Sequence, residues 1–198
     1  MGKLTIAAKV VQTLVRVGVH RIHGVVGDSL NGIVEEIRCT DGIDWISYRH
    51  EEAAAFAAGA EAQLTGKLAV CAGSCGPGNL HLINGLYDAN RSMAPVLAIA
   101  AHIPSSEVGT GYFQETHPDR LFVECSHYCE LISSARQMPR VLHIAMQHAV
   151  SKQGVAVIAL SGDVAMELVQ DESRSHGMTL ICPAVRPSEP DLQTLANM

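Results

Sequence analysis

The chain has 198 residues, of which 47% are hydrophobic and 17% charged, and its formal net charge is −6. This length and composition suit one domain with a large buried core. Aromatic residues make up only 4%, so the core must be built from Ala, Val, Ile and Leu. The negative balance argues against a nucleic-acid partner, because phosphate binding needs a basic face.

Six cysteines, at positions 39, 71, 75, 125, 129 and 182, form no C-x-x-C pair. Several lie in apolar runs, where a free cysteine behaves as a small hydrophobic residue. The first residues lack the pattern of a signal peptide, and no segment has the length of a membrane span. We therefore expect a soluble cytoplasmic protein with reduced thiols, which makes no membrane contact through this chain.

Helical and strand patterns alternate along the chain. Apolar residues at helical spacing predict a first helix over residues 4–17, which Gly18 ends. Four more helices are expected over residues 29–37, 51–64, 78–90 and 138–152, and six strands over residues 21–26, 45–48, 68–72, 95–101, 128–132 and 155–160. Strands with continuous apolar runs, separated by helices, indicate a parallel sheet covered on both faces, and hence an α/β fold. Residues 102–118 are expected to form a loop.

The pattern weakens after Asp163, and three prolines at positions 183, 187 and 190 punctuate the last segment. Ser188 followed by Pro190 predicts the start of a new helix, because proline is favourable at an early helical position. We therefore divide the chain into a domain over residues 1–184 and a segment over residues 185–198. This second segment is predicted to be a linker and the truncated start of a further domain.

The segment Arg49-His50-Glu51-Glu52 follows a short predicted strand and opens an alanine-rich helix. Two carboxylates in a first helical turn are ordinary, because they interact favourably with the helix dipole. The alternative is a single functional carboxylate at a strand-to-helix junction, where parallel sheets place their ligands. The run of small residues favours the alternative, since it predicts a helix buried on every side, with Glu51 buried at its start.

Two further segments have a structural and a functional interpretation. Residues 73–78, Gly-Ser-Cys-Gly-Pro-Gly, match neither a P-loop nor the dinucleotide fingerprint, so a tight turn is as good an account as ligand contact. Residues 111–118 place Phe113 beside Gln114 in a loop, a combination that can shape a small-substrate pocket. Taken alone, this loop is better explained by surface packing.

Cys125, His127 and Cys129 alternate, so on a strand they would share one face. A metal site would need a fourth ligand at suitable spacing, and none follows, so we predict no metal site in this chain. The sequence contains no G-x-S-x-G elbow and no H-E-x-x-H motif. Serine hydrolase and zinc protease activities are therefore not indicated.

Taken together, these segments resemble the thiamine-diphosphate enzymes. Residues 49–59 are similar to the glutamate-bearing helix of that family, and Gly76-Pro77-Gly78-Asn79 is similar to its G-P-G turn. Residues 24–32 and 111–118 resemble the pyruvate oxidases among them, including those that pass electrons through FAD to a quinone. The resemblance covers residues 4–185 and implies an aminopyrimidine-binding (PYR) domain: a three-layer α/β/α fold with a mainly parallel six-stranded sheet.

The resemblance also implies roles for individual residues. Glu51 matches the catalytic glutamate that hydrogen-bonds the aminopyrimidine ring of thiamine diphosphate and promotes its imino tautomer. Phe113 and Gln114 match catalytic residues that face the substrate. The residues expected to line the pyrimidine pocket beside Glu51 are Val26, Gly27, Gly76, Pro77 and Gly78.

The implied reaction is the oxidative decarboxylation of pyruvate to acetate and carbon dioxide. Mg²⁺ and FAD would be bound by domains outside this chain, because the magnesium motif of the diphosphate-binding (PP) domain has no counterpart here and Gly162-Asp163-Val164 does not replace it. The expected partners are a second copy of the chain, the PP domain of a neighbouring subunit and pyruvate; the longer parent protein could lie on the inner face of the membrane. Two alternatives stay open: a relative of acetolactate synthase or of the decarboxylases, and a non-catalytic dimerisation module.

Overall fold

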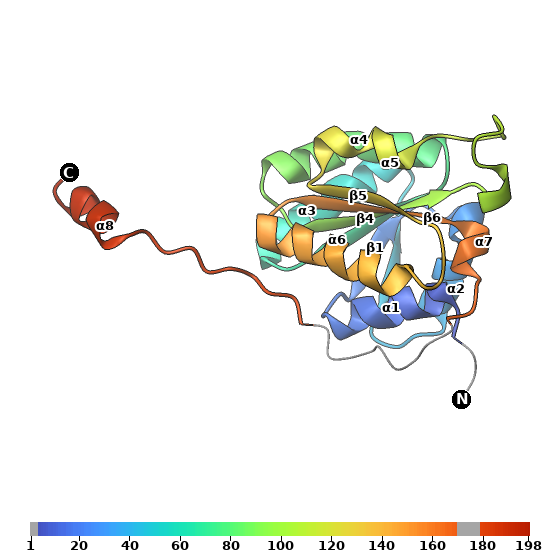
Figure 1. Ribbon diagram of the computed structural model, residues 1–198, viewed down its shortest axis with the longest axis horizontal. Coiled ribbons are helices and arrows are strands. Elements are labelled where there is room, and N and C mark those ends of the chain that lie inside the picture. Colours follow the sequence, from blue (N-terminus) through green and yellow to red (C-terminus); the bar gives the residue numbers. More distant parts are fainter. Residues whose placement is uncertain (1–3, 170–178) are drawn as a thin grey trace.

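Six short strands form one sheet in the computed structural model, which describes residues 4–169 and 179–198 (Figure 1). The strands are β1 (Arg21–Gly24), β2 (Asp44–Ser47), β3 (Ala69–Gly73), β4 (Val96–His102), β5 (Tyr128–Ile132) and β6 (Val155–Ser161), in the order β2-β1-β3-β4-β6-β5. Every neighbouring pair is parallel. The expected six-stranded α/β fold is confirmed, and this sheet is parallel throughout.

Helices cover both faces of the sheet, which gives three layers. One face carries α1 (Ile6–Arg16), α2 (Asn31–Arg38) and α6 (Met138–Lys152), and the other carries α3 (Glu51–Thr65), α4 (Pro77–Arg91) and α5 (Pro118–Leu121) (Figure 1). Successive residues of the central strands point to opposite cores: Val70 packs toward α1 and α6, whereas Cys71 packs toward α3 and α4. Strands buried on both faces explain the continuous apolar runs in the sequence.

The strand order changes direction between β1 and β3. The chain leaves β1 for β2 on one side, then returns to place β3 on the other side of β1. The segment after β1 continues through η1 (Asp28–Leu30) into α2 on one face, and the segment after β3 continues into α4 on the opposite face. A crevice at the carboxyl ends of the strands forms at such a switch point, where open α/β sheets bind their ligands.

Helices α3 and α4 lie side by side and run in the same direction. Residues thirty positions apart face each other along the pair: Ala55 meets Gly85, and Gly59 meets Ala89. A Cβ atom on Gly85 would lie 2.5 Å from the Ala55 Cβ and 2.7 Å from the Phe56 backbone nitrogen. The absence of that atom lets the two backbones approach, and this is why the segment is rich in glycine and alanine.

The expectation that the alanine-rich helix is buried on every side is wrong. Ala54 and Ala58 are buried against the chain's own core, but Ala53, Phe56 and Ala60 are exposed on the outer face of α3. A helix that covers a sheet has one face toward the strands and the opposite face toward solvent or a partner. Alanine is compatible with either face, so its frequency could not distinguish them.

The last described segment contains α8 (Glu189–Ala196), which lies apart from the sheet in Figure 1. Ser188 caps this helix and Pro190 lies in its first turn, as the sequence predicted. All residues from 181 to 198 are exposed. The domain limit at residue 184 stays a prediction.

Among the described residues, no helix combines the length and the apolar character that crossing a membrane would require.

Candidate functional site

Glu51 is the first residue of α3 and lies where the chain leaves the β2 edge of the sheet. His50 caps the helix, and its Nδ1 accepts a hydrogen bond from the Glu52 backbone N–H. The Glu51 side chain is 12% exposed, and its Oε2 lies 3.1 Å from Nδ1 of His81 in the first turns of α4. The carboxyl group is therefore nearly enclosed and held at one oxygen.

The glycine-rich turn after β3 approaches this carboxyl group closely. A Cβ atom on Gly78 would lie 3.0 Å from Oε1 of Glu51 and 3.3 Å from Cβ of Ser74. Gly76 has a φ of +66°, which favours glycine, and a Cβ there would lie 2.8 Å from Cβ of Gln114. The two glycines are thus needed on opposite sides of the turn, one toward Glu51 and one toward the loop that carries Gln114.

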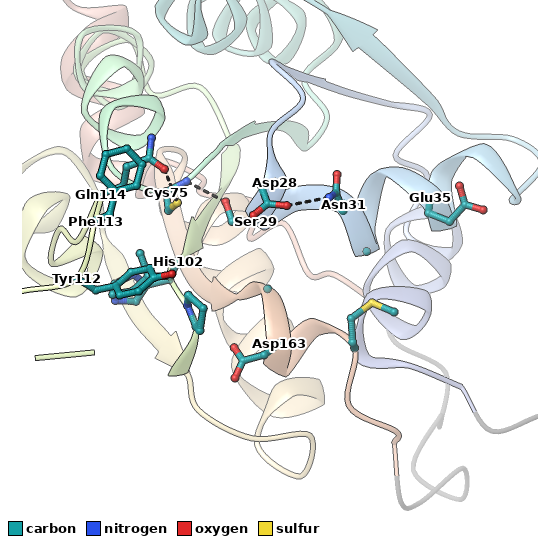
Figure 2. Close-up of a pocket in the computed structure, with 15 residues that line it drawn as sticks. Asp28, Ser29, Asn31, Glu35, Cys75, His102, Tyr112, Phe113, Gln114 and Asp163 are labelled. Atoms are coloured by element: carbon teal, nitrogen blue, oxygen red, sulfur yellow. Dashed lines mark hydrogen bonds between the residues drawn. The ribbon is translucent and has the colours of Figure 1, made fainter. Parts of the chain in front are cut away.

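Ser74 connects this turn to the segment after β1. A Cβ atom on Gly27 would lie 2.3 Å from the Ser74 Oγ, so only glycine fits there. The hydroxyl groups of Ser29 and Ser74 are 2.9 Å apart, and the Cys75 backbone N–H donates to the Ser29 Oγ at 3.0 Å (Figure 2). These bonds fix the two segments that diverge at the switch point.

A cavity of about 740 Å³ opens next to these bonds, at the carboxyl ends of the strands. Ser29 and Cys75 line one side, and Phe113 and Gln114 line another, with the Cys75 Sγ 3.5 Å from the Gln114 Oε1 (Figure 2). Residues at or just after the ends of β4 and β6 complete the wall: His102, Ile103, Pro104, Gly162 and Asp163. This volume is within the usual range for a site that binds a small molecule or part of a cofactor.

The loop that supplies Phe113 and Gln114 is held by a carboxylate. Glu115 accepts hydrogen bonds from the backbone N–H groups of Gly109, Gly111 and Tyr112, and these bonds lower the pKa of Glu115. Gln114 has a φ of +62°, a left-handed conformation that is unfavourable for a residue with a side chain. The hydrogen bonds to Glu115 hold the loop in this shape and bring Gln114 beside Gly76.

A second carboxylate fixes the start of the same loop. Asp163, in the short helix α7 (Gly162–Ala165), accepts hydrogen bonds from the backbone N–H and the hydroxyl group of Ser105. Burial raises the pKa of Asp163, but the Ser105 hydrogen bonds and backbone amides outweigh it, so the pKa is lowered overall. Asp163 thus attaches the start of the loop to the body of the domain, whereas Glu115 holds the loop together from within.

His102 is a buried polar residue in the cavity wall that the sequence did not indicate. It is 3% exposed, and its Nδ1 has no hydrogen-bond partner among the described residues. Burial lowers the pKa of His102, which favours the neutral imidazole. A neutral ring at this position can exchange a hydrogen bond with a ligand in the cavity.

The structure brings most of the predicted residues together. Glu51, Gly78, Gly27, Gly76 and Gln114 form a continuous series through Ser74 and Cys75, and Phe113 lies on the rim with 79% of its surface exposed. Of the predicted site residues, only Phe113 and Gln114 line the cavity itself. Glu51, Gly27, Gly76 and Gly78 lie beside it, and Val26 and Pro77 are exposed. The residues that sequence reasoning missed are Ser29, Ser74, Cys75, His81 and His102. The two serines and Cys75 lie within segments that were singled out, and His81 lies two residues after one of them.

Cys125, His127 and Cys129 do not share a strand face, because Cys125 lies in the turn η3 (Val123–Cys125) before β5. Burial raises the pKa of Cys125 to about 11 and that of Cys129 to about 12, so both stay neutral thiols. A different group, His50, Glu51 and His81, has ligand atoms within 4.8 Å of one another. The two imidazole rings are stacked 4.3 Å apart, so their nitrogen lone pairs do not converge on one ion.

Comparison with known proteins places this geometry in a family. Residues 4–121 match the model of the thiamine pyrophosphate enzymes, N-terminal TPP binding domain. The chain belongs to this family, and its three-layer α/β/α fold with a six-stranded parallel sheet agrees with that of an N-terminal TPP binding domain.

Particular relatives agree with this assignment. The chain is 60% identical over 199 residues to an uncharacterized 42.6 kDa protein of Pseudomonas amyloderamosa, covering 100% of the chain and 50% of the relative. It is 35% identical over 196 residues to the pyruvate oxidase of Lactiplantibacillus plantarum, covering 96% and 32%. It is 32% identical over 156 residues to the large subunit of acetolactate synthase isozyme 2 of Escherichia coli, covering 78% and 28%. The chain thus spans half or less of the length of these relatives.

The carboxylate that holds the loop predicts a pH dependence. Because hydrogen bonds hold the pKa of Glu115 below its ordinary value of 4.5, their stabilising contribution is fully present above pH 4.5 and is lost as pH falls through the lowered pKa. The amide resonances of Gly109, Gly111 and Tyr112 should therefore shift together in an NMR titration, with a midpoint below pH 4.5. In the Glu115→Gln variant, these three amide resonances should already have, at neutral pH, the chemical shifts that the wild type reaches only at low pH. A midpoint at or above pH 4.5 would contradict the role of Glu115 in holding the loop together.

Proposed function

We propose that this chain is the PYR domain of a thiamine-diphosphate- and FAD-dependent enzyme that oxidatively decarboxylates pyruvate to acetate and carbon dioxide. The observation that carries the proposal is the enclosed Glu51 carboxyl group, whose Oε1 faces the open side of Gly78. Membership of the thiamine pyrophosphate enzymes is already established by the family match. The substrate and the redox step are the parts that we propose.

The surroundings of Glu51 suit the pyrimidine half of the cofactor. Gly27, Gly76 and Gly78 pack closely against Ser74, Gln114 and Glu51, which leaves only backbone at these three positions. We propose that a flat ring lies against these backbones and presents a nitrogen to the Glu51 carboxyl group. We assign Glu51, Gly27, Gly76 and Gly78 to the pyrimidine pocket, with Val26 and Pro77 at its outer edge.

When bound, thiamine diphosphate supplies a carbon nucleophile for the keto group of the substrate. Glu51 shares a proton with a ring nitrogen, which is possible because the carboxyl group is shielded from water and held at the start of a helix. Phe113 and Gln114 enclose the substrate side of the cavity, Phe113 by excluding water and Gln114 by offering an amide to a carboxylate or carbonyl. His102 adds a buried hydrogen-bonding group to the cavity wall.

Pyruvate oxidation is favoured over acetolactate synthesis by the extent of similarity. The match to pyruvate oxidase covers 96% of the chain, against 78% for the acetolactate synthase large subunit.

We further propose that other segments of the full-length protein and a neighbouring subunit bind the diphosphate, Mg²⁺ and FAD, and that a quinone or oxygen accepts the electrons. The six cysteines are free thiols, which supports a cytoplasmic location.

Glu51 and its neighbour Glu52 provide a matched pair of variants. In the full-length protein with its cofactors, Glu51→Gln should lower pyruvate turnover with an artificial electron acceptor by about a hundredfold or more, because it removes the group that shares the proton. Glu52→Gln should leave turnover close to the wild-type value, since the Glu52 side chain contacts only Asn84 and His50 among the polar groups described and makes no contact with Glu51 or His81.

The same assay distinguishes the alternative reaction. Wild-type protein that consumes two keto acids to form acetolactate, without reducing the acceptor, would overturn the proposed oxidation. Equal losses in the Glu51 and Glu52 variants would overturn the role of Glu51.

The isolated chain should bind thiamine diphosphate weakly and should not decarboxylate pyruvate. One charge-assisted hydrogen bond contributes about 1.5–3 kcal/mol, and association costs at least about 4 kcal/mol. We therefore expect a dissociation constant above about 0.1 mM in calorimetric titrations with Mg²⁺ present. Micromolar affinity, or turnover by these 198 residues alone, would show that the chain holds the whole cofactor site.

We also propose that a second copy of the chain covers the outer face of α3 and α4. Phe56 on α3 and Leu80 on α4 are 41% and 45% exposed, and they lie within two turns of Glu51 and Gly78 along their helices. Sedimentation equilibrium should show a dimer at high micromolar concentration, and Phe56→Glu should shift it to monomer by burying a charge in the contact. Val185→Glu, an equal change at an exposed residue of the last segment, is the control. A wild-type monomer at that concentration would contradict the proposal.

A further inference from the structure

We propose that His81 is a positioning residue for Glu51: it holds Oε2 of the carboxyl group, so that Oε1 alone faces the cofactor. This inference rests on the proposed role of Glu51. It assigns a specific task to a histidine that lies thirty residues away in the sequence and on another helix.

The two oxygens of Glu51 lie in different surroundings. Oε2 is 3.1 Å from the His81 Nδ1, whereas Oε1 accepts no hydrogen bond from the described residues and packs beside Gly78. A carboxylate oxygen accepts, so the proposal places the proton of this contact on Nδ1 of His81. The hydrogen bond therefore occupies Oε2, so that only Oε1 is left to accept or share a proton with the ligand.

The His81 ring is itself held in place. It stacks on the ring of His50 at 4.3 Å with an angle of 25° between the planes. His50 is fixed in turn by its hydrogen bond to the Glu52 backbone N–H. The contact between α3 and α4 sets the distance, because Gly85 and Gly59 bring the helices together one and two turns further along. His81 thus presents Nδ1 to Glu51 from a rigid support.

The need for such a support follows from the chemistry proposed for Glu51. A glutamate side chain has three rotatable bonds, and sharing a proton with a ring nitrogen requires hydrogen-bonding distance and alignment. A charged hydrogen bond on the second oxygen restricts these rotations without blocking Oε1. The Nε2 atom of His81 is directed away from this contact, since Nδ1 makes it.

Three substitutions at position 81 separate the hydrogen bond from the stacking. His81→Asn keeps a donor near the position of Nδ1, His81→Gln moves the donor to the position of Nε2, and His81→Leu removes it; all three lose the ring stack on His50. Because 44% of the His81 side chain is exposed, we expect each variant to fold, and thermal unfolding checks this. Asn84→Leu is the matched control, since it breaks the neighbouring hydrogen bond between the same two helices, from Asn84 to Glu52.

The first measurement uses full-length protein with its cofactors and follows hydrogen–deuterium exchange at the thiazolium carbon by quenched-flow NMR. His81→Leu and His81→Gln should slow exchange by about tenfold or more, the effect of losing a hydrogen bond to a charged group. His81→Asn should stay within about threefold of wild type, and Asn84→Leu should equal it. Exchange in His81→Leu at the wild-type rate, or in His81→Asn as slow as in His81→Leu, would overturn the inference. A wild-type protein that does not accelerate exchange would instead contradict the proposed function itself.

The second measurement needs no cofactor. In the 198-residue chain labelled with ¹⁵N-histidine, the Nδ1 resonance of His81 should have the position of a protonated, hydrogen-bonded nitrogen at neutral pH. Glu51→Gln should shift it strongly, and Glu52→Gln should not. A non-protonated Nδ1, or a resonance that is insensitive to Glu51→Gln, would show that His81 does not hold the carboxyl group.

Discussion

The close contact between α3 and α4 is the constraint on which the rest of the site depends. Gly85 lets the two backbones meet at a distance that no side chain would allow, and the contact repeats one turn further along, where Gly59 packs tightly against Ala89. Glu51 and His81 lie at the start of the same row of facing residues. The orientation of the glutamate is therefore determined by helix packing, and not by the turn that contains it.

The position of the site follows from the topology of the sheet. The segments after β1 and β3 leave in opposite directions, and hydrogen bonds of Ser29 with Ser74 and Cys75 close the gap between them. The cavity then forms where the loop after β4 folds back over this point. Residues from four strand ends thus meet at one site. The parallel sheet places these ends at the same edge, the change of strand order opens a crevice there, and Asp163 and Glu115 hold the loop after β4 over it.

Much of the fold could be predicted from the sequence because its signals are local. Continuous apolar runs gave the six strands, and Pro190 and Ser188 gave the last helix, since each pattern reports on its own surroundings. Glu51 could be singled out because it lies at a strand-to-helix junction. His81 could not, because its importance comes from the register between two helices, which no single segment contains. His102 was missed for a related reason: only the folded chain shows that its Nδ1 is buried without a partner.

The register between α3 and α4 also has a consequence for how the chain folds. Glu51 to Arg91 forms a continuous helix–strand–helix unit, and its facing residues are only thirty positions apart, a short separation for a parallel sheet. Contacts between nearby segments close small loops and cost little chain entropy, so they form early on the folding pathway. The residues that hold the Glu51 carboxyl group are thus assembled within one continuous stretch of the chain. Strand β6 joins the sheet across a longer separation, since Val96 pairs with Val155.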